Sequence, residues 1–533
     1  MIGNQNRWQE DLFVASPLSS LIPDDHILKQ VDKVIDLSWL RKDVSELYCE
    51  SNGRPSIDPE ASIRLMLAGF FHGIVHDRKL MREPQVNIAI RWFAGYRLDE
   101  KLPDHSSLTR IRQRWGPELF KRVFQRTVKQ CVQAGLVNGD TVHVDATLIR
   151  ADVSWESLTE KHVEKVIAEN PIEQKDDSSD ASKGERTKAT KSRKISTTDP
   201  DASMTTSSHT YHMEPFYKQH TAVDDVAGVI VDVDLTTGQD SEGKQLPQQI
   251  ERIEENIGKS VKTITADSAY AYTSNYSLLE QRKIEAIIPP QAERTRSRRI
   301  PIRRFKYDAK NKIVRCPCGR ILRRSSRNGN GWIYRANPKD CRSCRLHHRC
   351  ISKTARARTI LITDNYESLL RARRRRRDWD EKPCRLYRRH RWQVEGRHGE
   401  AKTEHGLRRA VRRGLANVAI QVYLTAVVMN LKRLAAFLWP IFALFKKVLS
   451  HLTHFGGSEL QHQVNYSLEG EMDKSTWRYA LQRSVKNNYF FNSPTVTYFL
   501  VISTVRIPVS CRQGPSRQGS SSFLAIKNTV SAT

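Results

Sequence analysis

The first 137 residues space their hydrophobic positions as amphipathic helices do. In SIDPEASIRLMLAGFFHGI, apolar residues recur every three or four positions after Ser56 and Asp58, both typical N-cap residues. PDHSSLTRIRQRW predicts a second helix start, capped by Asp104 or Ser106, and a long amphipathic stretch follows it. We therefore expect an all-α N-terminal domain over residues 1–137.

After residue 137 the pattern changes to short β-branched runs separated by helical segments. VNGDTVHVD predicts a buried strand ending at Asp145, and HMEPFYKQHTAVDDVAGVIVDVDLTTG predicts two strands joined by a turn at Asp224–Gly228. A helix over about 243–257 leads to the strand VKTITAD, which ends at Asp267, and another helix leads to the strand IEAIIPP. The predicted order is strand, hairpin, helix, strand, helix, strand.

A helix carrying Glu395 completes this order, because no Gly or Pro lies between Arg385 and Val394. The succession is that of a ribonuclease-H-like fold. We therefore predict an α/β protein in which a ribonuclease-H-like mixed sheet, over residues 138–293 and 379–450, follows the all-α domain.

Three further segments have compositions unlike the predicted core. Residues 155–209 consist largely of Lys, Glu, Asp, Ser and Thr, which predicts a disordered charged insert. Residues 294–378 form a basic insert rich in cysteine. Residues 451–533 are a polar, patchy tail to which we assign no role.

The charge indicates a nucleic-acid partner. The chain has 88 Lys and Arg against 59 Asp and Glu, a formal net charge of +29. The arginines cluster in RTRSRRIPIRR, RARRRRR and LYRRHRW rather than being evenly spread. A helical domain with arginines on one helix is consistent with a helix-turn-helix-like DNA-binding domain, and equally with a packing or dimerisation domain.

Membrane association is not expected. The N-terminal residues have no apolar core typical of a secretory signal. The longest strongly apolar stretch, residues 435–445, is too short for a bilayer and is interrupted by Pro440. We expect a cytoplasmic, nucleoid-associated protein.

Three carboxylates lie at predicted positions that suit metal binding. Asp145 and Asp267 each end a predicted strand, at the edge where open α/β sheets place ligands, and Glu395 lies on the predicted helix. Magnesium prefers oxygen ligands, and a pair of ions can clamp both the attacking and the leaving oxygen of an in-line phosphoryl displacement. In a chain this basic, the three acids indicate chemistry on nucleic-acid phosphodiesters.

The neighbours of Glu395 support this interpretation. Arg391 is four residues before it and Lys402 seven after it, so all three share one helix face and two cations flank the carboxylate. An exposed ion-pair surface would show the same spacing. Glu400 and Glu404 are the alternatives to Glu395, although Glu400 lies on another face.

Several segments resemble the DDE transposases of bacterial insertion sequences, over roughly residues 10–440: PDHSSLTRIRQR, VHVDATLIRADVS, YKQHTAVDD, TADSAYAY, IIPP, the cysteine cluster and RWQVEGRHGEAKTEHGLRRAVRRGLANV. The resemblance is to the branch with an N-terminal helical domain and a ribonuclease-H-like catalytic domain. It implies that Asp145, Asp267 and Glu395 are catalytic and hold two Mg²⁺ ions, with Mn²⁺ as a substitute.

The resemblance also covers the residues around Glu395. It implies an Arg four before the Glu and a Lys seven after it, which here are Arg391 and Lys402, as DNA-binding residues. The family's Tyr, seven residues before the Glu, is replaced by Arg388, with Tyr387 one step earlier. No role is therefore assigned to a Tyr.

Five cysteines lie close together in the basic insert, in CPCG, CRSC and HHRC. Such knuckles are typical of structural Zn²⁺, which closes small loops that lack a core. Similar inserts in the family favour a zinc-type ligand set of Cys316, Cys341, Cys344 and Cys350. Cys318 is then a spare thiol and His347 an alternative ligand, and free thiols in a basic loop remain the other interpretation.

The sequence therefore predicts a Mg²⁺-dependent transposase that cleaves double-stranded DNA at insertion-sequence ends and transfers the strand into target DNA. A ribonuclease-H-like nuclease without strand transfer is one alternative. A catalytically silent, transposase-derived DNA-binding protein is the other. The family resemblance alone implies a homodimer, because synapsis brings two element ends together.

Overall fold

The computed structural model describes residues 17–49, 56–154, 158–161, 193–206, 213–292, 299–352 and 354–455. Nearly all of the predicted tail, residues 456–533, and much of the charged insert lie outside these residues. Contacts divide the chain into residues 1–442 and 443–533. All the structure discussed below belongs to the first of these units.

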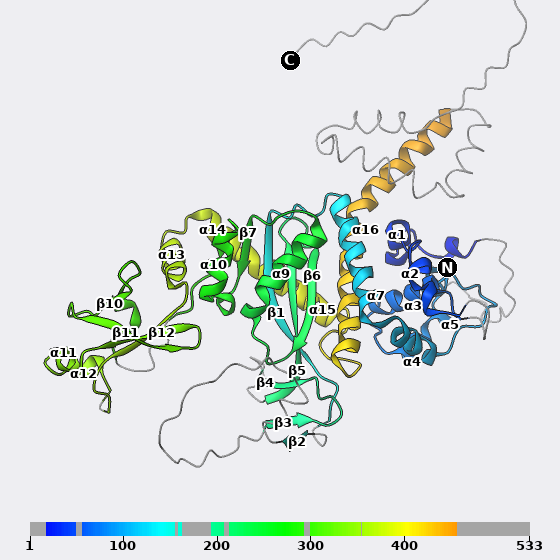
Figure 1. The fold of residues 1–533 in the computed structure, drawn as a ribbon. Helices are drawn as coiled ribbons and strands as arrows, with labels where there is room; N and C mark the ends of the chain where they lie inside the picture. The colour runs from blue at the N-terminus through cyan, green and yellow to red at the C-terminus, as the bar shows by residue number, and fades with distance from the viewer. Residues whose placement is uncertain are drawn as a thin grey trace, which may run out of the picture. The chain divides into compact units, whose positions relative to one another are not determined.

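The N-terminal region is helical, as the sequence predicts (Figure 1). Asp58 caps the third helix by accepting hydrogen bonds from two backbone amides, and Asp104 caps the longest helix of this region by accepting one from the Ser106 amide. That longest helix is kinked at Gly116, whose φ of 67° is easily reached only by glycine, directly before Pro117. The elements are η1 (Leu18–Leu21), α1 (Ile27–Val34), α2 (Leu40–Val44), η2 (Ser45–Leu47), α3 (Pro59–Phe71), α4 (Asp77–Leu80), α5 (Glu83–Val86), α6 (Ile88–Phe93) and α7 (His105–Gln133).

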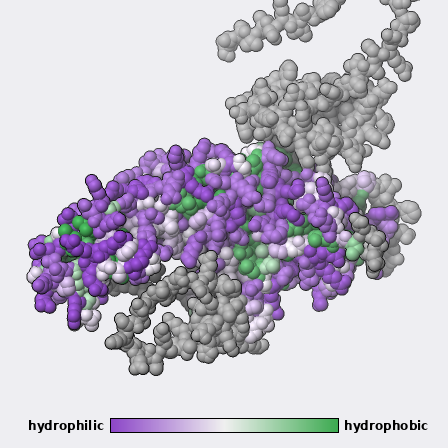
Figure 2. All heavy atoms as spheres, in the orientation of Figure 1, coloured by the Kyte–Doolittle hydropathy of each residue, from purple (hydrophilic) through white to green (hydrophobic). Residues whose placement is uncertain are grey.

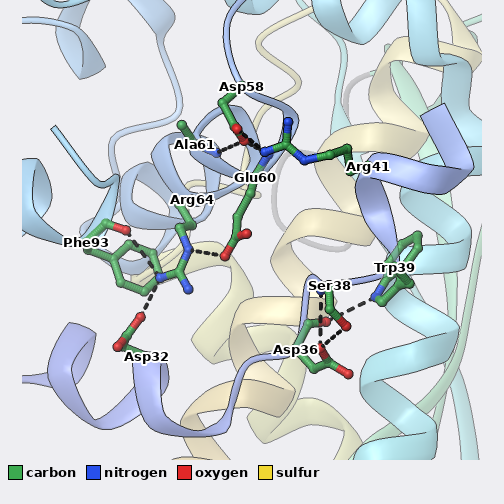
Figure 3. A network of polar contacts seen from close by, with 10 residues as sticks. All are labelled: Asp32, Asp36, Ser38, Trp39, Arg41, Asp58, Glu60, Ala61, Arg64 and Phe93. Carbon is green, nitrogen blue, oxygen red and sulfur yellow. Dashed lines mark hydrogen bonds and ion pairs between the residues drawn. The ribbon is translucent and has the colours of Figure 1, made fainter. Parts of the chain in front are cut away.

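A polar network ties these short helices together (Figure 3). The guanidinium of Arg64 on α3 donates to Asp32 of α1 at 2.5 Å, to Glu60 at 3.0 Å and to the carbonyl of Phe93 on α6 at 3.3 Å. Only 11% of the Arg64 side chain is exposed, so these bonds are shielded from water. One arginine therefore fixes three helices of the region.

A mixed sheet follows, in the strand order β6-β5-β1-β7-β8. β5 is antiparallel to both β1 and β6, whereas β7 is parallel to both β1 and β8. A short strand, β4, pairs with the first residues of β5. The bounds are β1 (Thr141–Arg150), β4 (Ser203–Thr206), β5 (Met213–Asp224), β6 (Ile230–Thr237), β7 (Thr263–Ala266) and β8 (Glu285–Ile287).

β1 is longer than the sequence predicts. Its parallel pairing with β7 stops at Val144, next to Asp145, but β5 continues to pair with it as far as Arg150. Asp145 therefore lies within a strand rather than at its end, whereas Asp267 directly follows β7 as predicted. The long partner strand β5 explains the difference.

Helices cover this sheet (Figure 1). α9 packs against β5 and β6, and α14 with η6 packs against β1, β5, β7 and β8. Asn430 of α16, fully buried, exchanges two hydrogen bonds with the backbone of Ile230 at 2.9 and 2.8 Å. The helices are α9 (Glu242–Ile257), η4 (Ser268–Tyr270), α10 (Thr273–Gln281), α14 (Glu381–His390), η6 (Arg391–Glu395), α15 (Gly396–Thr403) and α16 (Leu415–Phe455).

One part of α16 passes a length-and-composition test for a membrane span. Residues Leu415–Pro440 are long and apolar enough, but 72% of the critical stretch is buried inside the protein, as in the core helix of many folded domains. The apolar residues 435–445 singled out in the sequence lie within this longer helix. Elsewhere on the visible face hydrophobic side chains surface only in patches (Figure 2).

The charged insert is not structureless throughout. Besides β4, residues 155–209 contain the two-stranded pair β2 (Leu158–Lys161) and β3 (Arg193–Ser196), so the prediction of disorder is wrong for these strands. Asp199 is fully buried and accepts hydrogen bonds from the Tyr217 hydroxyl at 2.5 Å and from the amide of Gly414 at 3.2 Å. These contacts come from distant residues, which composition does not reveal.

The basic insert forms a sheet of its own, β13-β12-β11-β10-β9. Buried residues such as Val314, Leu322 and Tyr334 give it a hydrophobic core of its own. Alternation along short strands, with arginines on the exposed face, produces this core. The elements are η5 (Ile302–Arg304), β9 (Lys306–Asp308), β10 (Ile313–Arg315), β11 (Ile321–Asn328), β12 (Gly331–Ala336), α11 (Pro338–Arg342), α12 (His347–Cys350), β13 (Thr359–Thr363) and α13 (Tyr366–Arg377).

A buried histidine makes the stability of this fold depend on pH. Burial, with the charges of Lys218 and Arg252, lowers the pKa of fully buried His220 to about 3. An unfolded histidine titrates near 6.5, so His220 contributes stability above that pH, and the contribution is lost as the pH falls. At pH 5 the loss is about 2 kcal/mol.

We therefore expect the stability gap between the wild type and His220→Gln to narrow by about 2 kcal/mol between pH 7.5 and pH 5. Melting temperatures of both proteins at the two pH values measure this gap. A difference that stays constant would mean that His220 takes up its proton over the same pH range in the folded and the unfolded protein.

Candidate active site

The register of two parallel strands places Asp145 and Asp267 side by side. Val144 of β1 pairs with Ala266 of β7, so the two aspartates are the next residues on neighbouring strands. Asp267 also caps η4, accepting a hydrogen bond from the Ala269 amide at 2.8 Å with one carboxylate oxygen. The sequence prediction that these two acids meet at one edge of the sheet therefore agrees with the geometry.

A third carboxylate joins them, and it is not the predicted one. Oxygens of Asp145, Asp267 and Glu242, the first residue of α9, all lie within 4.8 Å of one another. The sequence analysis missed Glu242, because an acid in the first turn of a helix is commonplace and favourable there without any ligand. Only the packing of α9 against η4 reveals it.

The electrostatics of this acid cluster are those of a site in which negative charge exceeds positive charge. Burial, and then the carboxylates of Asp267 and Glu242, raise the pKa of Asp145 to about 7. The phenol of Tyr270 is fully buried, and burial followed by the charges of Asp145, Glu242 and Asp267 raises its pKa. Among the described residues its hydroxyl has no hydrogen-bond partner. All the ligand atoms in the cluster are oxygens, which suits a hard divalent cation.

Glu395 lies nearby but outside the close group. Both its oxygens accept hydrogen bonds from Nε of Arg391, at 3.1 and 3.2 Å, and 59% of its side chain is exposed. Its charge still contributes to the raised pKa of Asp145. The segment Arg391–Glu395 is a π-helical turn between α14 and α15, a rare geometry that often occurs at functional sites.

The predicted DNA-binding cations occupy different settings. The Arg391 side chain is 78% exposed, whereas Lys402 is half-buried and donates to the hydroxyl of Thr147 on β1 at 2.6 Å. Burial and the charge of Arg408 lower the pKa of Lys402, and Asp145 opposes this. Lys402 therefore lies beside the strand that carries Asp145.

A buried polar network fixes the Glu395 helix on the sheet. His390 bonds to the carbonyl of Val144 at 3.0 Å, directly before Asp145. Gln393 donates to the carbonyl of Asp225 at 2.9 Å, and Arg389 pairs with the Asp225 carboxylate at 2.8 Å. The helix is therefore anchored next to Asp145 by the side chains of Arg389, His390 and Gln393 rather than by Glu395.

The alternative glutamate, Glu400, is engaged elsewhere. Its carboxylate pairs with Arg397 at 3.0 Å, Arg433 at 2.6 Å and Lys432 at 3.1 Å, with 15% of the side chain exposed. Glu400, Glu404 and His405 also lie close enough together to hold a metal ion. Lys432 and Arg433 already neutralise that cluster, which favours a structural role.

Comparison with known proteins points to a family. Residues 16–114 match a family described as "Transposase domain (DUF772)", and residues 315–435 match a family described as "Transposase DDE domain". These two matches support a DDE transposase. The second match contains Glu395, Arg391 and Lys402, whereas Asp145 and Asp267 lie outside both matches.

Other comparisons add little. A solved structure similar to this chain is described as the cryo-EM structure of a piggyBac transposase synaptic complex with hairpin DNA. It is 10% identical with a TM-score of 0.29, over 91% of this chain and 86% of that one, which is too weak to support any assignment. No curated protein matches the chain.

The five clustered cysteines lie in the insert that forms a separate sheet. Cys341 and Cys350 are buried in its hydrophobic core, and Cys316 packs against that core. The sulfurs of Cys344 and Cys318 are 3.3 Å apart, so the thiol that the sequence left as a spare has a close partner. No three of the insert's described cysteines and histidines come within 4.8 Å of one another.

Proposed function

We propose that this protein is a transposase that cleaves DNA at the ends of an insertion sequence and transfers the strand into target DNA by metal-dependent phosphoryl transfer. The observation that carries the proposal is the juxtaposition of Asp145 and Asp267 by parallel strand register. The strand order β6-β5-β1-β7-β8, with β1, β5 and β6 antiparallel, supports a ribonuclease-H-like fold for this core.

The site's own residues account for the proposed chemistry. Divalent ions, two Mg²⁺ or Mn²⁺ in its place, would polarise the scissile phosphate and make the attacking water a better nucleophile. Asp145, Asp267 and Glu395 are the proposed metal-ligating and catalytic residues. Arg391 and Lys402 flank them and are the proposed contacts to phosphates on either side of the scissile bond.

A basic groove offers a path for the phosphate backbone of double-stranded DNA. It has a volume of about 1060 Å³ and lies between α4 and the start of α7 in the helical region and the residues that precede α16. Arg78, Lys79 and Arg82 line it as exposed cations on one wall, and Arg413 is exposed on the other. Such an array attracts phosphates in a salt-dependent way.

Removing two of these cations should weaken DNA binding without affecting chemistry. We expect Lys79→Ala with Arg82→Ala to reduce DNA affinity about tenfold at moderate salt, and the slope of log K against log salt to fall by about 2. Fluorescence anisotropy with labelled duplex measures both. Lys129→Ala with Lys283→Ala removes two exposed lysines outside the groove and should change neither value.

We propose that the insert holds a structural Zn²⁺ through Cys316, Cys341, Cys344 and Cys350. The purified chain should then contain about one zinc per protomer by elemental analysis, and Cys341→Ser should lose it. Because Cys318 lies against Cys344, Cys318→Ser tests the alternative set. If Cys318→Ser loses zinc and Cys316→Ser retains it, the ligand set is the alternative one.

The test of the function is a cleavage and joining reaction. Wild-type protein, expected to act as a homodimer in the cytoplasm and nucleoid, is incubated with double-stranded DNA carrying the flanking element ends and a target plasmid, with Mg²⁺ or with EDTA. Mg²⁺-dependent joining of a 3′-hydroxyl end supports the proposal. Cleavage without joining would indicate a nuclease, and binding without cleavage a catalytically silent DNA-binding protein.

A further inference from the structure

Glu242 stands closer to the two aspartates than Glu395 does, although the family resemblance assigns it no role. We propose that Glu242 is a metal-ligating residue, so that in the absence of DNA a divalent cation is held by Asp145, Glu242 and Asp267. This inference rests on the metal-dependent function proposed above and adds a carboxylate from a different element, the start of α9.

The first support is the packing that brings Glu242 to the site. A Cβ atom at Gly243 would overlap the Tyr272 ring and lie 2.9 Å from the carbonyl oxygen of Ala269. Only glycine allows α9 to approach the turn after Asp267 this closely. The buried Asn275 then bridges the two segments, donating to the carbonyls of Gly243 at 2.7 Å and Tyr270 at 3.0 Å. Glu242 is therefore held in position by contacts on both sides.

The second support is the buried hydroxyl of Tyr270. This side chain is fully buried, and its hydroxyl has no hydrogen-bond partner among the described residues. Burial raises the pKa of this hydroxyl, and the charges of Asp145, Glu242 and Asp267 act on it and raise that pKa further. An unpartnered buried hydroxyl is costly, and a cation with its bound water would supply the partner that these residues lack.

The charge balance of the site points the same way. The only ion pair that Glu242 makes among the described residues is with Lys218, at 3.2 Å, and Lys218 also donates to the carbonyl of Asp240 at 2.6 Å. This ammonium group and that of Lys402, which interacts with Asp145, do not balance three carboxylates within 4.8 Å of one another. Glu395, by contrast, is fully paired with Arg391 and largely exposed. In the DNA-free protein Glu242 is thus the available third ligand.

Titration of the DNA-free full-length protein with Mn²⁺ by isothermal calorimetry tests this. Glu242→Gln, which keeps the shape of the side chain and removes its charge, should weaken Mn²⁺ binding about tenfold or more. Lys218→Met, which removes the competing ammonium, should bind Mn²⁺ several-fold more tightly. Glu251→Gln, an exposed glutamate on the same helix that pairs with Arg282, is the matched control and should bind as the wild type does.

The outcomes separate this inference from the proposed function. Wild-type Mn²⁺ affinity in folded Glu242→Gln, or unchanged affinity in Lys218→Met, would overturn the role of Glu242 alone. Unchanged affinity in Asp267→Ala would overturn the metal site itself. If Glu242→Gln melts at a lower temperature, the Mn²⁺-induced rise in melting temperature decides the matter, because a merely structural glutamate would leave that rise intact.

Discussion

Asp145→Asn is expected to lose DNA cleavage and joining by about 1000-fold while the protein becomes no less stable. The loss follows because a metal-ligating carboxylate supplies several kcal/mol of transition-state stabilisation, and about 4 kcal/mol corresponds to 1000-fold in rate. The expected stability of the variant has a different cause, the repulsion between neighbouring carboxylates. Asp145 is a buried carboxylate beside Asp267 and Glu242, and a neutral amide removes that repulsion.

Three measurements on the same preparation check this prediction. A gel assay of cleavage and joining should show the loss, fluorescence anisotropy should show DNA affinity equal to or above that of the wild type, and the melting temperature should hold or rise. Asp267→Asn should lose activity equally, although its carboxylate also caps η4, so its melting temperature is expected to fall slightly. Joining by either variant would refute the assignment of the site.

The sequence predicts that these two aspartates lie together because the local strand signals and the sheet topology agree. β-branched runs ending in an acid predict strands, and parallel strands bring such acids to one edge of the sheet. The capping residues Asp58 and Asp104 are predicted for the same reason, since the cap and the helix after it are contiguous in sequence. Features that depend on residues within about ten positions of one another can therefore be predicted from the sequence.

Contacts between segments that are distant in the sequence cannot be predicted in this way. Glu242 joins the site because Gly243 allows α9 to pack on the turn that follows Asp267 and Asn275 fastens the two, about 30 residues apart. The strand β4 and the buried Asp199 lie in a segment whose composition predicts disorder, yet Tyr217 and Gly414 supply partners from elsewhere. Burial of this kind depends on the assembled sheet.

The choice between Glu395 and Glu400 is a second case that sequence spacing alone does not settle. The two glutamates are five residues apart, and the structure gives them opposite surroundings. The Glu395 side chain is 59% exposed and pairs with one arginine, whereas Glu400 is 15% exposed and pairs with Arg397, Lys432 and Arg433. A carboxylate that binds a metal ion must be able to leave its ion-pair partners, whereas a carboxylate at the centre of a structural ion-pair network must keep them.

Glu400→Gln is therefore expected to destabilise the protein by about 3 kcal/mol, because it leaves several mostly buried cations without their counter-charge. Burial opposes ionisation of Glu400, but the His405 hydrogen bond and the charges of Lys432 and Arg397 lower its pKa. This stability is present above the ordinary glutamate pKa and is lost as the pH falls below it. The melting temperature at pH 7.5 should fall by several degrees, with residual activity below that temperature.

Glu395→Gln should give the reverse result. An exposed ion pair four residues apart on a helix contributes well under about 1 kcal/mol, so the melting temperature should match that of the wild type while cleavage and joining are lost. Glu404→Gln, whose carboxylate is 56% exposed and pairs with Lys432, is the control that should alter neither property greatly. If Glu400→Gln instead kept its melting temperature and lost activity, Glu400 would be the catalytic glutamate and the exposed pair at Arg391–Glu395 only a surface contact.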